Sequence, residues 1–122
     1  MAWHRLLVGL FCVGALWAPT QALAHAHLDR AMPAAGSTVS GSPKEVVLWF
    51  TEAIEAKFSS IEVRDSKGAL VHDGKASGVP DNTAQLRVGL KPLAPGSYRV
   101  KWRVLSVDTH RAQGDFTFRV AP

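Results

Sequence analysis

Hydrophobic and polar residues alternate along several short stretches of the chain, and turn-forming residues separate these stretches. The clearest is 98–104, where aromatic and β-branched residues occupy every second position and Arg or Lys the positions between them. Residues 60–64, 86–90 and 115–120 repeat the alternation, and side chains at alternate positions of a strand point to opposite faces. The run Val46–Phe50 is apolar throughout, which is typical of a strand buried on both faces. These patterns predict short strands and no long helix.

The spacing of the strands indicates the fold class. Asp65-Ser66-Lys67-Gly68 has the composition of a hairpin turn and leads into residues 69–72, whereas 51–59 can hold one helical turn. Roughly six or seven strands at intervals of about 8–12 residues are typical of an antiparallel sandwich. The length of 122 residues fits one such all-β domain. The aromatic residues that we expect in its core are Trp49, Trp102, Phe116 and Phe118.

The beginning of the chain differs in composition from the rest. Arg5 precedes the apolar run Leu6–Trp17, and Ala22-Leu23-Ala24 places small residues where signal peptidase needs them. The run is shorter than the roughly 20 residues that span a bilayer. We therefore predict a secretory signal peptide at 1–24, exported by the general route, and a mature domain at 25–122.

Removal of this segment changes what the composition allows. The whole chain has a formal charge of +4, and the loss of Arg5 lowers that charge by one. A net positive charge this small, without a basic run, gives no reason to expect nucleic acid as a partner. The single cysteine, Cys12, leaves with the signal peptide, so the mature domain has no disulfide and no thiolate ligand. The hydrophobic core must therefore stabilise it alone.

Asp108 and His110 are the first candidates for a functional site. They follow the strongest predicted strand and stand two positions apart, so in extended chain they would present a carboxylate and an imidazole on the same side. Aspartate is common in turns, so this pair alone is weak evidence for a metal site. His72 lies in the turn-like stretch Val71–Gly74, where we expect a surface histidine without a role.

The predicted N-terminus adds metal ligands to this pair. Cleavage after residue 24 makes His25 the first residue, and a free N-terminal histidine offers both its α-amine and its ring Nδ1 to one metal ion. Both groups lose their protons readily when a metal binds. With Asp108 and His110 they form a nitrogen-rich set with one hard oxygen, which suits tetragonal Cu(II). Zinc is chemically compatible with the same set.

His27 leaves a second binding mode open. A free amine with histidine in third place can bind Cu(II) through two deprotonated backbone amides, so His25-Ala26-His27 could act as an N-terminal clamp without the folded domain. We favour the folded site, because the clamp gives no role to Asp108 and His110. A second small-x-small sequence also allows cleavage before His27, which would again leave a histidine first.

Four parts of the mature chain together resemble the periplasmic copper-resistance proteins of the CopC type. These parts are His25–Leu28, Pro33–Ser37, Leu48–Glu52, and the stretch from Tyr98 to Val104 that runs on into Asp108–His110 and Gly114–Phe118. The resemblance extends over essentially all of residues 25–122.

The resemblance implies a Greek-key sandwich, cupredoxin-like or immunoglobulin-like, that binds one Cu(II) ion per chain in the periplasm. The family's N-terminal histidine and Asp-x-His pair correspond to His25, Asp108 and His110. A glutamate near the copper corresponds to Glu52, which implies an axial or supporting role for it. Some members also carry a methionine-rich loop for Cu(I). The matching region here, Val71–Asn82, has no methionine, so we expect Cu(II) alone.

These observations predict a monomeric copper carrier or buffer, serving copper resistance or homeostasis, with an inner-membrane protein of the CopD type as its partner. One alternative is a copper-dependent oxidative enzyme, because lytic polysaccharide monooxygenases also bind copper through an N-terminal histidine. We expect no enzyme, since Asp108 would occupy a position that oxygen chemistry needs open. The other alternative, an immunoglobulin-like interaction module without metal, explains the sandwich but not the four matching parts.

Overall fold

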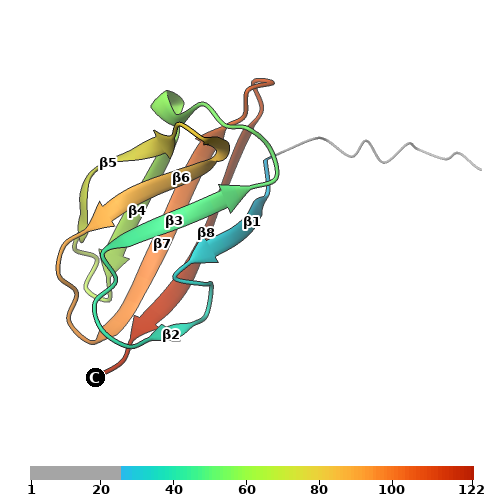
Figure 1. Cartoon of the computed structure of the whole chain (residues 1–122). Helices are drawn as coiled ribbons and strands as arrows, with labels where there is room; N and C mark the ends of the chain where they lie inside the picture. The colour runs from blue at the N-terminus through green and yellow to red at the C-terminus, as the bar shows by residue number, and fades with distance from the viewer. Residues whose placement is uncertain (1–25) are drawn as a thin grey trace, which may run out of the picture.

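Two four-stranded β-sheets face each other in the computed structural model, which describes residues 26–122 (Figure 1). The first sheet contains, in spatial order, β1 (Leu28–Met32), β3 (Glu45–Phe50), β6 (Asn82–Leu90) and β5 (His72–Val79). The second contains β2 (Thr38–Val39), β8 (Arg111–Val120), β7 (Gly96–Leu105) and β4 (Ser60–Asp65). The predicted signal peptide at 1–24 and His25 lie outside the described residues. The all-β sandwich is confirmed.

The strand pairing is antiparallel apart from one short contact. The two residues of β2 pair in parallel with the end of β8, which the sequence pattern did not predict. The helical turn expected within 51–59 is a single 3₁₀ turn, η1 (Ala56–Phe58). No helix among residues 26–122 is long and apolar enough to cross a membrane.

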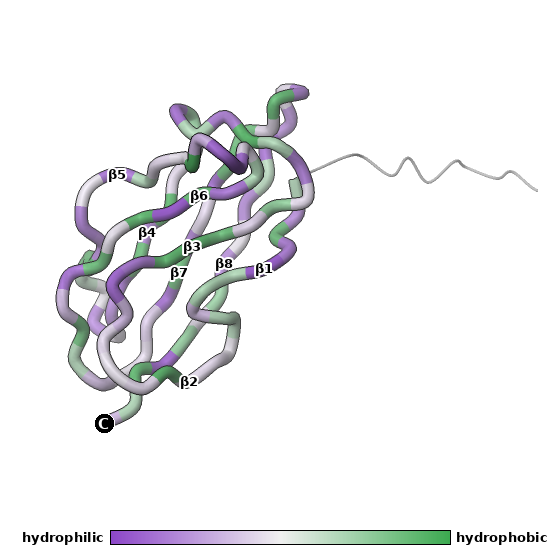
Figure 2. Tube along the Cα trace, viewed as in Figure 1, coloured by the Kyte–Doolittle hydropathy of each residue, from purple (hydrophilic) through white to green (hydrophobic). Residues whose placement is uncertain are grey.

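The predicted alternation of β7 is confirmed and forms the centre of the core. Tyr98, Val100, Trp102 and Val104 are at most 8% exposed, whereas the basic residues between them are exposed. Figure 2 shows the same alternation of hydrophobic and hydrophilic positions along the strands. Phe118 lies fully inside the core, where its ring stacks on that of Tyr98 at 5.5 Å between centroids.

Trp49 is not a core residue, so that prediction is wrong. Val46, Leu48 and Phe50 fill the inner face of β3, which turns Trp49 to the outer face. There it is only half-buried, and the Arg30 guanidinium lies 4.0 Å from the centre of its ring. Phe116, also expected in the core, is half-buried and packs against the core cluster.

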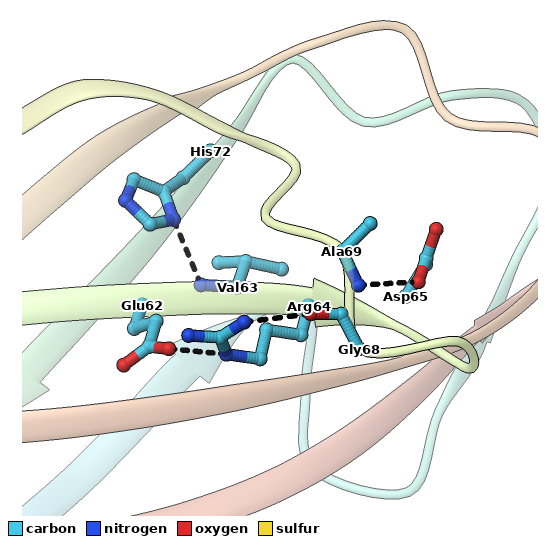
Figure 3. Close-up of polar contacts among 7 residues, drawn as sticks. All are labelled: Glu62, Val63, Arg64, Asp65, Gly68, Ala69 and His72. Carbon is cyan, nitrogen blue, oxygen red and sulfur yellow. Dashed lines mark hydrogen bonds and ion pairs between the residues drawn. The ribbon is translucent and has the colours of Figure 1, made fainter.

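The assignment of His72 to a surface turn is also wrong. The turn at residues 65–68 forms as predicted, but the chain then crosses to the other sheet and His72 begins β5. Its ring Nδ1 accepts a hydrogen bond from the Val63 amide at 3.1 Å (Figure 3). His72 therefore links β5 to β4 in the opposite sheet.

Gly114 is required by the packing of β7 against β8. It lies opposite Trp102 in the register, and a Cβ at this position would lie 2.5 Å from Cζ2 of the indole. Trp102 is buried and packs edge-on against Phe50, so the ring has little room to move. We expect Gly114→Ala to lower the free energy of unfolding by about 1–3 kcal/mol, measured by urea denaturation.

The matched control is Gly89→Ala in β6. A Cβ added at this position would meet nothing closer than the Asp73 carbonyl oxygen at 3.6 Å, which is an ordinary contact. We expect this change to stay within about 0.5 kcal/mol. Equal losses in the two variants would contradict the packing argument.

Candidate metal centre

Three segments that are distant in sequence meet at one end of the sandwich: the start of the described chain, the loop after β3, and the hairpin between β7 and β8 (Figure 1). The first two are joined by two hydrogen bonds between His27 and Thr51. The Thr51 amide donates to the His27 carbonyl oxygen at 2.8 Å, and the His27 amide donates to Thr51 Oγ1 at 2.9 Å. Ala26 is only 1% exposed. The chain is therefore fixed in place from Ala26 onward.

The loop after β3 is in turn bonded to the hairpin. The Val107 amide donates to the Ala53 carbonyl oxygen at 3.1 Å, and the Glu55 amide donates to the Leu105 carbonyl oxygen at 2.7 Å. Ile54, which is buried, forms a β-bridge with Ser106 between these two bonds. The loop that carries Glu52 thus lies directly against the segment that leads to Asp108.

Ser106 organises the hairpin from inside. It is fully buried, its amide donates to the His110 carbonyl oxygen at 2.8 Å, and its Oγ accepts from the His110 amide at 3.2 Å. Its carbonyl oxygen accepts from the Thr109 amide, and Thr109 has a φ of 73°, in the left-handed region. Asp108 and His110 therefore come together through a tight turn and not through extended chain. Their proximity was predicted for the wrong geometric reason.

The carboxylate and imidazole face each other on this turn. Asp108 Oδ1 lies 3.3 Å from His110 Nδ1, and both side chains are close to half exposed. The Ser106 hydroxyl donates to the same Oδ1. This hydrogen bond, more than the neighbouring His110, lowers the pKa of Asp108 below its ordinary value, although partial desolvation opposes it. Asp108 is therefore an anion, as a metal ligand must be.

The donor atoms of this pair suit a metal ion. Two ligand atoms, each about 2.0–2.1 Å from a small divalent ion, lie roughly 3 Å apart when they occupy neighbouring positions. The separation of 3.3 Å is close to that value. Within residues 26–122, however, no three His, Cys, Asp or Glu side chains are grouped so that they could hold a metal. Asp108 and His110 are therefore a pair of candidate ligands and not a complete site within these residues.

The structure describes some of the remaining predicted ligands and not others. Glu52 is half-buried in the loop beside the hairpin, and its role at the metal stays a prediction. His27 is exposed, and its backbone is paired with Thr51. His25 lies outside the described residues, so its part in the site also stays a prediction.

Ser106 is the residue that sequence reasoning missed. A serine before an aspartate in a turn is common, and only burial distinguishes this one. We expect Ser106→Ala to weaken copper binding by about 10–100-fold, the usual effect of removing a group that orients a ligand. In the metal-free protein, NMR titration of the Asp108 carboxyl carbon should show its pKa returning toward the ordinary value.

Ser59→Ala is the control for this variant. Ser59 Oγ also holds backbone at this end, since it donates to the Glu55 carbonyl oxygen and accepts from the Leu105 amide, but it does not hydrogen-bond to Asp108. Copper affinity and the Asp108 pKa should be unchanged in it. If Ser59→Ala changed both as strongly, Ser106 would be a general structural residue only.

Comparisons with known proteins identify the family of the chain. The family model described as the CopC domain matches residues 28–121. The chain belongs to the CopC family. Protein YobA of Escherichia coli K12 is 38% identical over 98 residues, which cover 80% of this chain and 79% of the relative. Copper resistance protein C of E. coli is 34% identical over 106 residues, covering 81% and 83%.

Solved CopC structures show the same fold. CopC from Methylosinus trichosporium OB3b is 43% identical, with a TM-score of 0.76 over 80% of this chain and 95% of that one. PcoC, described as a methionine-rich copper resistance protein of E. coli, is 32% identical with a TM-score of 0.70, over 80% and 99%. This CopC-family chain has only two methionines in its full sequence. Membership in this family supports a copper-related function.

Proposed function

We propose that this CopC-family protein is exported to the periplasm and binds one Cu(II) ion there, as a carrier or buffer in copper resistance or homeostasis. The observation that carries the proposal is the Asp108–His110 pair, held by buried Ser106 at the end of the sandwich where the described chain begins. His25 adjoins Ala26, which is buried at that end. The residue proposed as the third ligand thus directly precedes a part of the chain that is fixed at this end.

The chemistry of the donor set favours copper in its oxidised form. His25 would contribute its amine and a ring nitrogen, Asp108 an oxygen, and His110 an imidazole nitrogen. Such nitrogen-rich sets with one hard oxygen bind Cu(II) above the other divalent ions of the first row. Cu(I) prefers thiolate and thioether ligands, and residues 25–122 contain no cysteine and only Met32.

The backbone contacts of His27 favour the folded site over the N-terminal clamp. The clamp requires the amide nitrogens of Ala26 and His27 to lose their protons and bind copper. In the folded protein the His27 amide donates to Thr51 Oγ1, and Ala26 is buried. The clamp would therefore have to break this hydrogen bond and expose Ala26, which the folded site leaves in place.

We propose that the protein is a carrier and not an enzyme. We propose further that it is a monomer and that its partner is a CopD-type membrane protein. Polysaccharide-oxidising enzymes bind their substrate on exposed aromatic and polar surface. Here Trp102 and Phe118 are buried, and Trp49 lies under Arg30 on the outer face of the first sheet. Release of oxidised products from a polysaccharide with copper and reductant would overturn this part of the proposal.

A Cu(II) titration followed by EPR tests the function. The protein is exported and processed by a bacterial host, and intact mass identifies its first residue. We expect one stoichiometric tetragonal signal and a first residue of His25. Loss of the signal in the presence of a weak competing chelator would show that copper binds only adventitiously and would overturn the proposal.

A further inference from the structure

The outer face of the second sheet is strongly basic. Alternate residues of β4, β7 and β8 point outward from it. Six of these residues are basic and two are acidic: Arg64, Arg99, Lys101, Arg103, Arg111 and Arg119 against Glu62 and Asp115. The alternation within β7 places three of these charges on one face, and the sheet register adds those of β4 and β8.

The positive charges on this face are not equally compensated. Arg64 pairs with Glu62, and Arg99 pairs with Asp115. Lys101 stands between the same two acids in the register. The acidic side chains are therefore all engaged in the middle of the face.

Nearer the Asp108–His110 hairpin, two cations have neutral neighbours. Arg103 lies opposite Ser60 and Gln113, and Arg111 lies opposite Leu105. Neither arginine has an ion pair within residues 26–122. Their charge is thus available to a partner.

A groove lies between these two arginines and η1. It has a volume of about 640 Å³, and its lining includes Phe58, Ser60, Arg103, Leu105, Arg111 and Gln113. Phe58 is 72% exposed, so its ring is open to contact from outside. The groove therefore offers an aromatic ring and two arginines side by side, and both residue types are enriched at protein–protein interfaces.

The groove adjoins the proposed copper site. Arg111 directly follows His110 in the chain, and Leu105 directly precedes Ser106. A segment bound along the groove would thus end within a few residues of Asp108 and His110.

We propose that the groove of Phe58, Arg103 and Arg111 docks an acidic, partly apolar segment of the protein that exchanges copper with the hairpin. The nature of that partner rests on the proposed function, whereas the acidic chemistry rests on the groove alone. A protein segment fits better than an anionic membrane, because the two arginines with neutral neighbours line a groove beside Phe58, whereas acidic side chains already pair with Arg64 and Arg99 on the rest of the face.

The test is an NMR titration of the exported, processed protein labelled with ¹⁵N. The probe is a short soluble peptide of alternating glutamate and leucine, and the same peptide with lysine in place of glutamate is the negative probe. We expect shifts at Phe58, Ser60 and Gln113 with the acidic peptide only, and weaker binding as salt is added. Replacing both arginines, Arg103→Gln with Arg111→Gln, should weaken binding roughly tenfold.

Arg119→Gln is the matched control, an exposed arginine on the same face at the other end of β8. It should leave peptide binding unchanged, and every variant should keep the copper EPR signal. The docking proposal would be overturned by equal weakening in Arg119→Gln, by shifts spread over the whole face, or by no shifts at all. Binding of the same arginines to phosphatidylglycerol vesicles but not to the peptide would overturn it too.

This design distinguishes failure of the docking proposal from failure of the proposed copper function. If copper binds and the peptide does not, the groove is wrong and the copper function stands. If the peptide binds at the groove and copper does not, the docking site stands but its partner is not a copper-exchanging protein.

Discussion

His110→Ala is expected to weaken Cu(II) binding by about a hundredfold or more. Loss of a group that merely supports a ligand already costs about 10–100-fold, and this change removes the ligand itself. It also leaves Asp108 without the imidazole that lies 3.3 Å from its carboxylate. The measurement is a competition titration against a chelator of known affinity, with EPR to follow the ligand set.

Two further variants make this result specific. His72→Gln keeps a hydrogen-bond acceptor near the Val63 amide. It lies opposite Leu90, at the end of β6 that pairs with the beginning of β3 and away from the hairpin, so copper affinity should not change. His27→Ala separates the two binding modes. A folded site predicts a severe loss for His110→Ala and a small one for His27→Ala, and the N-terminal clamp predicts the reverse.

One glycine added before His25 is expected to do comparable damage. The extra residue separates the α-amine from the imidazole, so the two nitrogens can no longer bind one ion in a small ring. The rest of the fold should be unaffected, because the added residue precedes Ala26, from which the chain is fixed. We expect a loss of about a hundredfold or more and an EPR spectrum with one nitrogen fewer.

The two proteins for this comparison are best made with a cleavable tag, so that intact mass confirms His25 first in one and glycine first in the other. One glycine added after Pro122 is the control and should not change binding. Unchanged affinity with glycine in front of His25 would show that the N-terminal histidine is not a ligand. Asp108 and His110 would then bind copper together with other ligands.

The strands that sequence predicted best have one buried face. The pattern of β7 was readable because the sheet separates its residues cleanly into core and solvent. β5 was missed because most of its residues are polar or small and are not buried, so no hydrophobic period marks it. Trp49 was misplaced because an apolar run without alternation does not reveal which side chains face inward.

The candidate site was predictable in its residues and not in its construction. Asp108 and His110 could be selected by chemistry and spacing. Ser106 could not, because its importance comes from complete burial beneath the turn, which depends on Ile54 and the loop after β3. That loop is brought to the hairpin by tertiary hydrogen bonds for which the sequence has no local signal.

The position of the hairpin also bears on how copper would act on the protein as a whole. The chain from Ala26 is paired with the end of the first sheet, whereas Asp108 and His110 belong to the second. An ion held by both would cross-link the two layers at this end and close a loop of most of the domain. Loading would then tighten the sandwich, and loss of the ion would loosen the same end.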